Sequence, residues 1–260
     1  MNAHQSLYSI LFLLSLSLSH QSVLRLPSDH RKSLGPARGR GEDDSLYCDS
    51  WRFSVETNDA GKWSTVPSRC ADYVRDYVTG ERYVSDSSVA ADNALEFARA
   101  VGASSDGRDA WVFDIDETLL SNLPYYEEHG FGSEAFEETS FDDWVELAKA
   151  PALPASLPLY NELRQLNFTI FLLTGRSEHQ RNATATNMLR AGYTGWEKLF
   201  LRGDSDQGKP ATVYKSEKRS EIVSAGYTIQ GSSGDQWSDL TGFATAVRSF
   251  KLPNPMYYIP

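Results

Sequence analysis

The chain has 260 residues, of which 40% are hydrophobic and 23% are charged, a balance typical of a globular protein rather than a disordered one. This length is sufficient for one large domain with a substantial core. The formal net charge of −10 argues against nucleic acid or anionic membranes as partners, and an anionic substrate would need a metal ion or local basic groups to bind.

Residues 1–20 are predicted to be a secretory signal peptide. Their run "LYSILFLLSLSL" is shorter than the roughly 20 apolar residues that a membrane-spanning helix needs. The preceding "MNAHQS" lacks the Lys or Arg of a typical signal, so a signal anchor is the alternative. Residues 21–45 contain several basic residues, Pro and Gly, and are predicted to be a linker or a removable pro-segment. We therefore expect an extracellular or vacuolar protein without stable membrane insertion.

The chain contains two cysteines, Cys48 and Cys70. In a secreted protein, such a pair predicts one disulfide that closes an N-terminal loop, and two free buried thiols are the alternative. Sequons at Asn167 and Asn182 predict N-glycosylation sites, although Asn167 directly precedes a predicted strand.

Helical and strand patterns alternate from about residue 85 onward. The predicted helices are 87–101, 141–150, 156–167, 178–191, 215–225 and a last one from Asp239, and the predicted strands are 110–115, 168–174, 198–202 and 227–234. Such alternation indicates an α/β fold with a mostly parallel sheet and helices on both faces. In these sheets, ligands bind beyond the carboxyl ends of the strands.

Residues 119–167 separate the first two predicted strands by far more than a simple crossover helix requires. This insertion is rich in aromatic and acidic residues and is predicted to be a helical cap over the site; a surface insertion without contact to the site is the alternative. Its aromatic side chains could line a pocket for an aromatic or nucleotide phosphate, or they could form the cap's own core. They are Tyr125, Tyr126, Phe131, Phe136 and Trp144.

The stretch "WVFDIDETLL" ends a predicted strand with two acids, Asp114 and Asp116. A strand core normally excludes carboxylates, because an unpaired buried charge is costly. In extended backbone both side chains would point to one side, where Mg²⁺ would relieve their repulsion. One acid could attack phosphorus and the other could transfer protons. A solvated loop after the strand is the alternative for this pattern alone.

Two further polar motifs follow predicted strands. In "LLTGR", the Thr174 hydroxyl and the free backbone N–H groups around Gly175 would suit an anion, and a helix cap is the alternative role for Thr174. In "GDQWSDL", Asp235 and Asp239 could ligate or orient a cation, or they could cap the last helix.

Lys215 is predicted at the start of a helix, where the helix dipole disfavours a cation. This position indicates that Lys215 interacts with an anion or with Asp114. Lys209, in the Gly-containing stretch "GDSDQGKP", is the second candidate for that role, although such a loop favours a solvated side chain.

The order of these motifs resembles the haloacid dehalogenase (HAD) phosphohydrolases. The stretches "CDSWRFSVETNDAGKWSTVPSRCADYV", "DIDETLLSNLPYY" and "SFKLPNPMYYIP" are similar to the plant acid phosphatases and vegetative storage proteins of that superfamily, of class IIIB type. The similarity covers most of the predicted domain, residues 46–260. It implies a Rossmann-like core with a small helical cap, and Mg²⁺-dependent hydrolysis of phosphate monoesters at acidic pH.

The resemblance also implies roles for individual residues. Asp114 matches the nucleophile, and Asp116 matches the general acid/base. Thr174, together with Gly175, matches the position that binds the transferring phosphoryl group. Lys215 matches the lysine that neutralises the charges of nucleophile and phosphate.

The resemblance further implies a Mg²⁺ site. Its ligands would be Asp114, the backbone carbonyl of Asp116, and Asp235, with Asp239 in support. Oxygen ligands of this kind are the ones that Mg²⁺ prefers.

The leading hypothesis is an acid phosphatase that forms an aspartyl-phosphate on Asp114. The alternative is a vegetative storage protein with low or no activity, since storage relatives can lack the nucleophilic aspartate. Asp114 is present here, which favours an enzyme. A phosphotransferase with an alcohol acceptor and a cation-dependent binding module would use the same residues. The expected partner is a small phosphate monoester, and a homodimer is implied by the resemblance only.

Overall fold

The computed structural model describes residues 40–259. The predicted signal peptide and residues 21–39 of the predicted linker lie outside this range. Helix α2 begins at Arg40, so the last residues of the predicted linker are helical. From Gly41 onward the described residues form one compact unit. Within the described part of the chain, no helix has both the length and the apolar character needed to cross a membrane.

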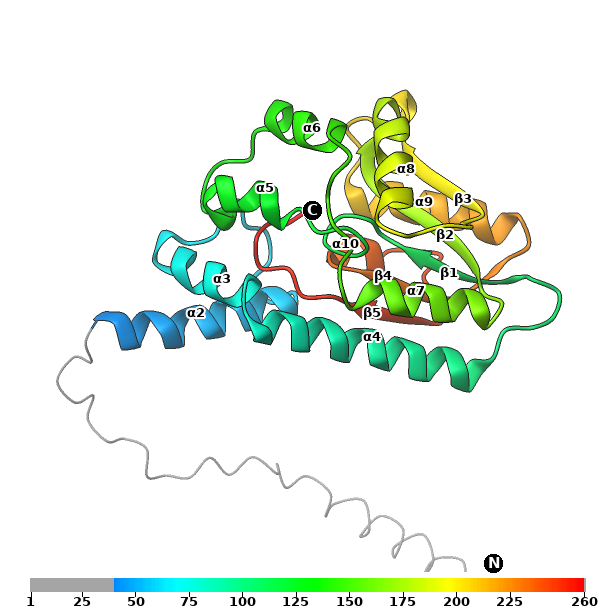
Figure 1. Ribbon diagram of the computed structural model, residues 1–260, viewed down its shortest axis with the longest axis horizontal. Coiled ribbons are helices and arrows are strands. Elements are labelled where there is room, and N and C mark those ends of the chain that lie inside the picture. The colour runs from blue at the N-terminus through cyan, green and yellow to red at the C-terminus, as the bar shows by residue number, and fades with distance from the viewer. Residues whose placement is uncertain (1–39, 260) are drawn as a thin grey trace, which may run out of the picture. The chain divides into compact units, whose positions relative to one another are not determined.

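Five parallel strands form one sheet in the order β3-β2-β1-β4-β5 (Figure 1). Their bounds are Asp109–Phe113 (β1), Thr169–Ser177 (β2), Lys198–Arg202 (β3), Thr228–Gly234 (β4) and Arg248–Lys251 (β5). The four predicted strands are confirmed, with β1 at the centre. The fifth strand escaped prediction because "RSFK" is short, lies at the sheet edge and has a charged residue at each end.

Nine α-helices surround the sheet within the described residues. Their bounds are Arg40–Glu56 (α2), Ala71–Val78 (α3), Glu81–Val101 (α4), Leu123–Glu128 (α5), Glu138–Glu146 (α6), Ser156–Gln165 (α7), Arg181–Arg190 (α8), Ala211–Ser224 (α9) and Trp237–Leu240 (α10). The prediction of a last helix from Asp239 was wrong, because α10 begins earlier and has four residues. The chain turns away after α10 through Gly242, at φ 94°, to reach β5.

Alternate residues of the strands point to opposite faces of the sheet and build two separate cores. On one face, Trp111 and Phe113 of β1 pack with buried residues of α4 and α7. On the other face, Val112 packs with Tyr214 and Ile222 of α9. Because both faces are covered, the central strands are continuously apolar, as expected for a parallel sheet.

The predicted cap, residues 119–167, divides into two parts. Helices α5 and α6 lie away from the sheet (Figure 1). Helix α7 instead packs on the sheet through Leu159, Tyr160 and Leu163, so it is the crossover helix that leads to β2 rather than part of the cap. Its buried apolar positions recur at three- and four-residue intervals, which is the spacing of a helix with one core-facing side.

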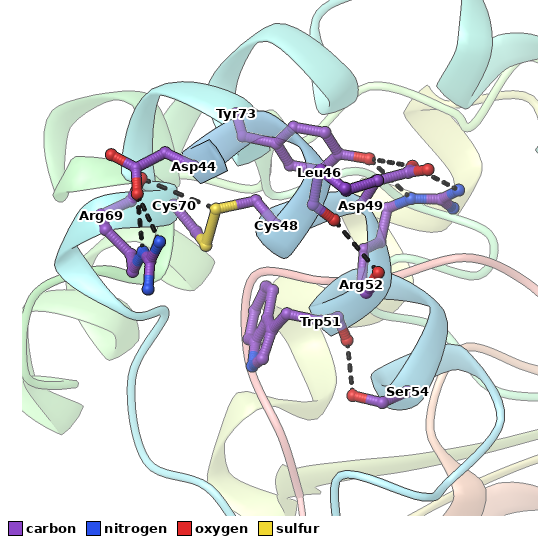
Figure 2. The surroundings of a disulfide bond; sticks show 11 residues. Asp44, Leu46, Cys48, Asp49, Trp51, Arg52, Ser54, Arg69, Cys70 and Tyr73 are labelled. Atoms are coloured by element: carbon purple, nitrogen blue, oxygen red, sulfur yellow. Dashed lines mark hydrogen bonds and ion pairs between the residues drawn. A yellow bond between two sulfur atoms is a disulfide. The ribbon is translucent and has the colours of Figure 1, made fainter. Parts of the chain in front are cut away.

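A disulfide between Cys48 of α2 and Cys70 joins the first helices, as predicted (Figure 2). The two Cα atoms are 5.4 Å apart, and both cysteines are fully buried. Beside this bond, Arg69 donates two hydrogen bonds to the Asp44 carboxylate. Asp44, which lies in the range predicted as linker, is thereby tied to the residue next to Cys70.

Residues 252–259, here called the C-terminal segment, leave β5 and run towards α5 (Figure 1). Leu252 and Met256 are buried in a third core with residues of α2, α3 and α5. Gly132 of the cap has φ 87°, and a side chain there would overlap the Met256 carbonyl. The C-terminal segment therefore packs directly against the cap.

The two predicted glycosylation sites lie at the surface. Asn167 is exposed and lies two residues before the first residue of β2, Thr169, and Asn182 is exposed on α8. Glycan occupancy stays a prediction.

Candidate active site

The predicted site residues converge beyond the carboxyl ends of the strands. Asp114 directly follows β1, Asp235 directly follows β4, and Gly175 lies near the end of β2. Together with Asp116 and Lys215 they line a cavity of about 400 Å³. This edge of the sheet is where α/β folds bind their ligands.

Lys215 lies between two buried carboxylates. Its Nζ donates to Asp114 Oδ1 at 2.6 Å and also to Asp239 Oδ1. The lysine is in the second turn of α9 rather than at its start, because the helix begins at Ala211 after Pro210. Burial alone would lower the pKa of Lys215, but the two carboxylates raise it, so the ammonium stays charged.

Lys209, the second candidate, lies outside the cavity lining. Its ammonium pairs with Asp206 at 3.0 Å and with Glu217 at 2.6 Å. Of the two lysines, therefore, Lys215 is the one that contacts the acids of the cavity, Asp114 and Asp239.

Three buried carboxylates, of Asp114, Asp235 and Asp239, offer oxygens that lie within 4.8 Å of one another. Three anions held this closely against one ammonium leave excess negative charge in a buried place, and a hard divalent cation would compensate it. The donor set therefore fits Mg²⁺. The side chain of Asp116 is not in this cluster, in contrast to the simple expectation that both acids of the D-x-D pair face one ion.

The Asp235 carboxylate is held by several donors. Oδ2 accepts from Gln236 Nε2 at 2.6 Å and from Asn254 Nδ2 at 2.7 Å, and Oδ1 accepts from the Thr118 hydroxyl at 3.3 Å. Gly234, just before it, must lack a side chain, since a Cβ there would overlap Asp239. The backbone thus allows the two acids of the "GDQWSD" motif to lie together.

Asp239 also has both oxygens in use. Oδ1 faces Lys215, and Oδ2 accepts from the Gln236 backbone N–H at 2.9 Å. Asp239 is therefore better suited to orienting Lys215 than to binding a cation through a free oxygen.

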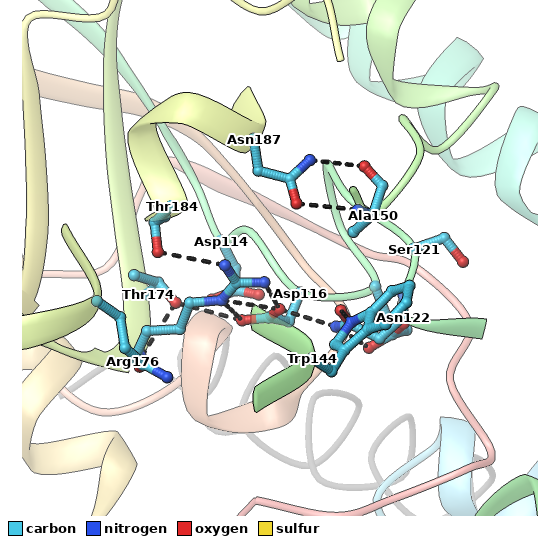
Figure 3. A network of polar contacts seen from close by, with 12 residues as sticks. Asp114, Asp116, Ser121, Asn122, Trp144, Ala150, Thr174, Arg176, Thr184 and Asn187 are labelled. Carbon is cyan, nitrogen blue, oxygen red and sulfur yellow. Dashed lines mark hydrogen bonds and ion pairs between the residues drawn. The ribbon is translucent and has the colours of Figure 1, made fainter. Parts of the chain in front are cut away.

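Asp116 pairs with Arg176, a residue to which the sequence analysis gave no role (Figure 3). The guanidinium donates to Oδ1 at 2.7 Å and to Oδ2 at 3.1 Å, and Asn122 Nδ2 donates to Oδ1 at 2.8 Å. Burial would raise the pKa of Asp116, but Arg176 outweighs it and holds this pKa below the ordinary value. The basic residue that ends "LLTGR", Arg176, could have indicated a partner for an acid at the neighbouring strand end.

The predicted phosphoryl-binding residues lie beside this ion pair. Thr174 is fully buried, and its hydroxyl lies 3.4 Å from Asp116 Oδ2 and accepts from the Arg176 backbone N–H at 3.2 Å. Gly175 is exposed to the cavity, and the space that a Cβ would occupy is open. This open backbone leaves room for an anion near Asp114.

The cap supplies aromatic side chains to the cavity, although not all the predicted ones. Tyr125, Tyr126 and Phe136 line it. Phe131 instead packs against the third core, and Trp144 Nε1 donates to Asn122 Oδ1 at 2.9 Å, outside the cavity lining. The predicted aromatic residues therefore divide into two groups: some line the cavity, and the others pack in the cap.

The C-terminal segment forms another wall that the sequence analysis did not assign to the site. Met256, Tyr257, Tyr258 and Ile259 line the cavity. The Tyr257 hydroxyl donates to the buried carboxylate of Glu117. This segment approaches the strand ends only through the tertiary fold, so no local pattern could indicate its position.

The pKa values of the buried acids show the same crowding of negative charge. Burial and repulsion from Asp239 raise the pKa of Asp114 well above its ordinary value, although Lys215 opposes the shift. The same two causes raise the pKa of Asp235 to about 6. Burial, followed by the charge of Asp116, raises the pKa of Glu117 to about 8.

Comparison with known proteins agrees with this geometry. The family model described as HAD superfamily, subfamily IIIB (acid phosphatase) matches residues 37–260. The chain belongs to this family. The expected membership is thereby confirmed.

Individual relatives of the acid phosphatase family extend the comparison. The chain is 55% identical over 216 residues to acid phosphatase 1 of Solanum lycopersicum, covering 83% of the chain and 85% of that relative. It is 39% identical to vegetative storage protein 2 of Arabidopsis thaliana, covering 82% and 80%. A class C acid phosphatase of Bacillus anthracis, solved with tungstate bound, has 25% identity and a TM-score of 0.58 over 72% of the chain and 85% of that structure. The HAD-type fold is thus confirmed, and the chain groups with phosphoric monoester hydrolases.

For this acid phosphatase family member we expect the metal-free protein to be more stable at pH 5 than at pH 8. Asp235 and Glu117 have raised pKa values, so the folded state binds more protons than the unfolded chain between about pH 4 and pH 8. Stability is present at low pH and is lost as the pH rises through these values. Thermal unfolding in a chelator, measured from pH 5 to pH 8, checks the sign.

The variant Glu117→Gln serves as the control, because it removes one of these titrations and should flatten the upper part of the profile. A melting temperature that rises with pH in the chelated wild type would contradict the expectation.

Proposed function

We propose that this protein is a Mg²⁺-dependent acid phosphatase that hydrolyses phosphate monoesters through a covalent phosphoryl group on Asp114. The observation that carries the proposal is the position of Asp114. Its buried carboxylate lines the cavity at the end of β1, is held through Oδ1 by Lys215, and has Oδ2 outside that ion pair.

In the first step, Asp114 Oδ2 attacks phosphorus, and the bond from phosphorus to the ester oxygen breaks. Asp116, in the small protonated fraction that its pairing with Arg176 allows, donates its proton to the leaving alcohol. Lys215 reduces the repulsion between the attacking carboxylate and the phosphate. The open backbone at Gly175 would orient the phosphoryl oxygens. Thr174, which is fully buried and outside the cavity lining, stays a predicted partner of the phosphoryl group.

In the second step, the Asp116 carboxylate removes a proton from water, and the water oxygen attacks phosphorus. The bond to Asp114 breaks, which releases phosphate and restores both aspartates to their starting states. Arg176 keeps Asp116 at a fixed place through both transfers and favours its ionised form, which is the form needed to activate water.

Asp114 and Asp235 would hold the Mg²⁺ ion, with Asp239 orienting Lys215 beside them. The backbone carbonyl of Asp116 stays a predicted ligand. When bound, the ion would act as a Lewis acid that neutralises charge on the phosphoryl oxygens. The acid-rich cluster described above supports this assignment.

The proposal is tested by hydrolysis of p-nitrophenyl phosphate at about pH 5.5. Treatment with a chelator should abolish turnover, and Mg²⁺ should restore it. Addition of an alcohol should raise the release of p-nitrophenol relative to phosphate, because alcohol and water then compete for one phosphoenzyme. Equal release of both products at every alcohol concentration would exclude transfer from the phosphoenzyme to alcohol, and turnover that is insensitive to the chelator would contradict the metal assignment.

A storage protein with little activity is the second candidate, supported by the similarity to vegetative storage protein 2 of Arabidopsis thaliana. Absence of turnover in the same assay with Mg²⁺ would favour it. The complete set of charged side chains at the site supports the enzyme instead. We further propose a secreted or vacuolar location, which rests on the predicted signal peptide, and glycans on Asn167 and Asn182, which rest on their sequons. A homodimer is proposed from the sequence resemblance alone.

A further inference from the structure

Asn254, in the C-terminal segment, is almost fully buried, with 1% of its surface exposed. Its side-chain amide donates to Asp235 Oδ2 at 2.7 Å. Its Oδ1 accepts from the Met256 backbone N–H at 2.9 Å, and its own backbone N–H donates to Glu56 Oε1 at 3.0 Å. These three contacts fix both the position and the orientation of the Asn254 amide.

The second contact point of the segment lies on α2. Glu56 Oε2 pairs with Lys251 at 2.8 Å, while Oε1 holds the backbone of Asn254. Both partners of the Glu56–Lys251 pair are largely buried, with 16% of each side chain exposed. Helix α2 therefore holds the C-terminal segment in place from outside the cavity.

These contacts determine which oxygen of the Asp235 carboxylate is available to a cation. The amides of Asn254 and Gln236 occupy Oδ2, so Oδ1, which contacts only the Thr118 hydroxyl among the described residues, is the oxygen left for a cation. A carboxylate held in this way does not lose rotational freedom when the cation binds, and outer-shell hydrogen bonds of this kind raise metal affinity.

We infer that Asn254 is a positioning residue for the metal site: it fixes the Asp235 carboxylate in the orientation that binds Mg²⁺. The inference rests on the proposed function. It gives the C-terminal segment a role in catalysis although Asn254 itself touches neither the cavity nor the substrate.

The test uses Asn254→Ser in the full chain. The shorter hydroxyl can still accept from the Met256 N–H but cannot reach Asp235 Oδ2. Isothermal titration with MgCl₂, without substrate and at a temperature where the variant is folded, should show a Kd at least about tenfold higher than in the wild type. The KM for p-nitrophenyl phosphate at saturating Mg²⁺ should stay the same.

Glu56→Gln is the matched control. It removes the ion pair with Lys251 but leaves the Asn254 amide in place, so it should lower the melting temperature while the Mg²⁺ Kd changes less than about twofold. Equal weakening of Mg²⁺ binding in both variants would assign the effect to general loosening of the segment and would overturn the inference.

Other outcomes are also decisive. A wild-type protein that binds no Mg²⁺ would refute the proposed function, whereas a wild-type Kd in Asn254→Ser would refute the inference alone. Asn254→Ala is the second variant, with the same expected rise in Kd. Failure of both variants to fold would assign Asn254 to the fold rather than to the metal site.

Discussion

The Asp114→Asn variant is expected to lose at least about a thousandfold in the rate of aryl phosphate hydrolysis, because an amide cannot serve as the nucleophile that forms the proposed phosphoenzyme. The substitution preserves shape, and Lys215 keeps its contact with Asp239. Steady-state rates at pH 5.5 with saturating Mg²⁺ are the measurement.

The same variant should be at least as stable as the wild type when metal is absent. Burial and the charge of Asp239 raise the pKa of Asp114, so its ionised form destabilises the fold, and an amide removes that charge. A thermal melt in a chelator therefore separates loss of chemistry from loss of structure.

Asp204→Asn is the control: Asp204 is exposed and does not line the cavity, so this variant should leave both quantities unchanged. A residual rate within tenfold of the wild type in Asp114→Asn would remove Asp114 from the mechanism.

Lys215→Met should lose both activity and stability. The substitution leaves the buried carboxylates of Asp114 and Asp239 without their cation, and breaking such a pair costs about 3 kcal/mol or more. The loss of stability should be smaller at pH 5 than at pH 7, because Asp114, whose pKa is raised by burial and by the charge of Asp239, takes up a proton and relieves part of the uncompensated charge. Urea unfolding at both pH values, in a chelator, gives the free energies of unfolding.

Lys209→Met provides the matched control on the same side of the sheet. The Lys209 side chain is 31% exposed, and the buried Asp206 keeps a second cation, Lys218, at 3.5 Å, so this variant should change stability little and activity not at all. Equal losses in the two lysine variants would show that the buried pairing of Lys215 has no special importance.

The core of the fold was predictable because local patterns coincide with tertiary position. Uninterrupted apolar runs marked β1 and β2, and the acids at the end of β1 could be recognised because they break such a run. The cap boundary was less visible, since α7 has the same helical spacing whether it covers the sheet or the cap. Only its packing on Phe113 and its neighbours makes it a crossover helix.

The site residues that belong to a local sequence motif could be predicted. The residues that contact them from a distant part of the chain could not. Asp114, Asp116 and Asp235 each follow a strand, so topology brings them together. The pairing of Arg176 with Asp116 depends on side-chain direction across two strands. The contact of Asn254 with Asp235 depends on the path of the chain after β5, which has no periodic signal.

The C-terminal segment has a consequence for the order in which the molecule folds. Tyr257 meets Glu117 across 140 positions and Asn254 meets Glu56 across 198, which are longer separations than those within the sheet, where β1 pairs Val112 with Ser232 of β4. Such distant pairings form late, because the chain must lose much of its freedom before they contribute. A partly folded intermediate can thus contain a complete sheet and still lack a working centre, and return of activity should report the last event of refolding rather than the first.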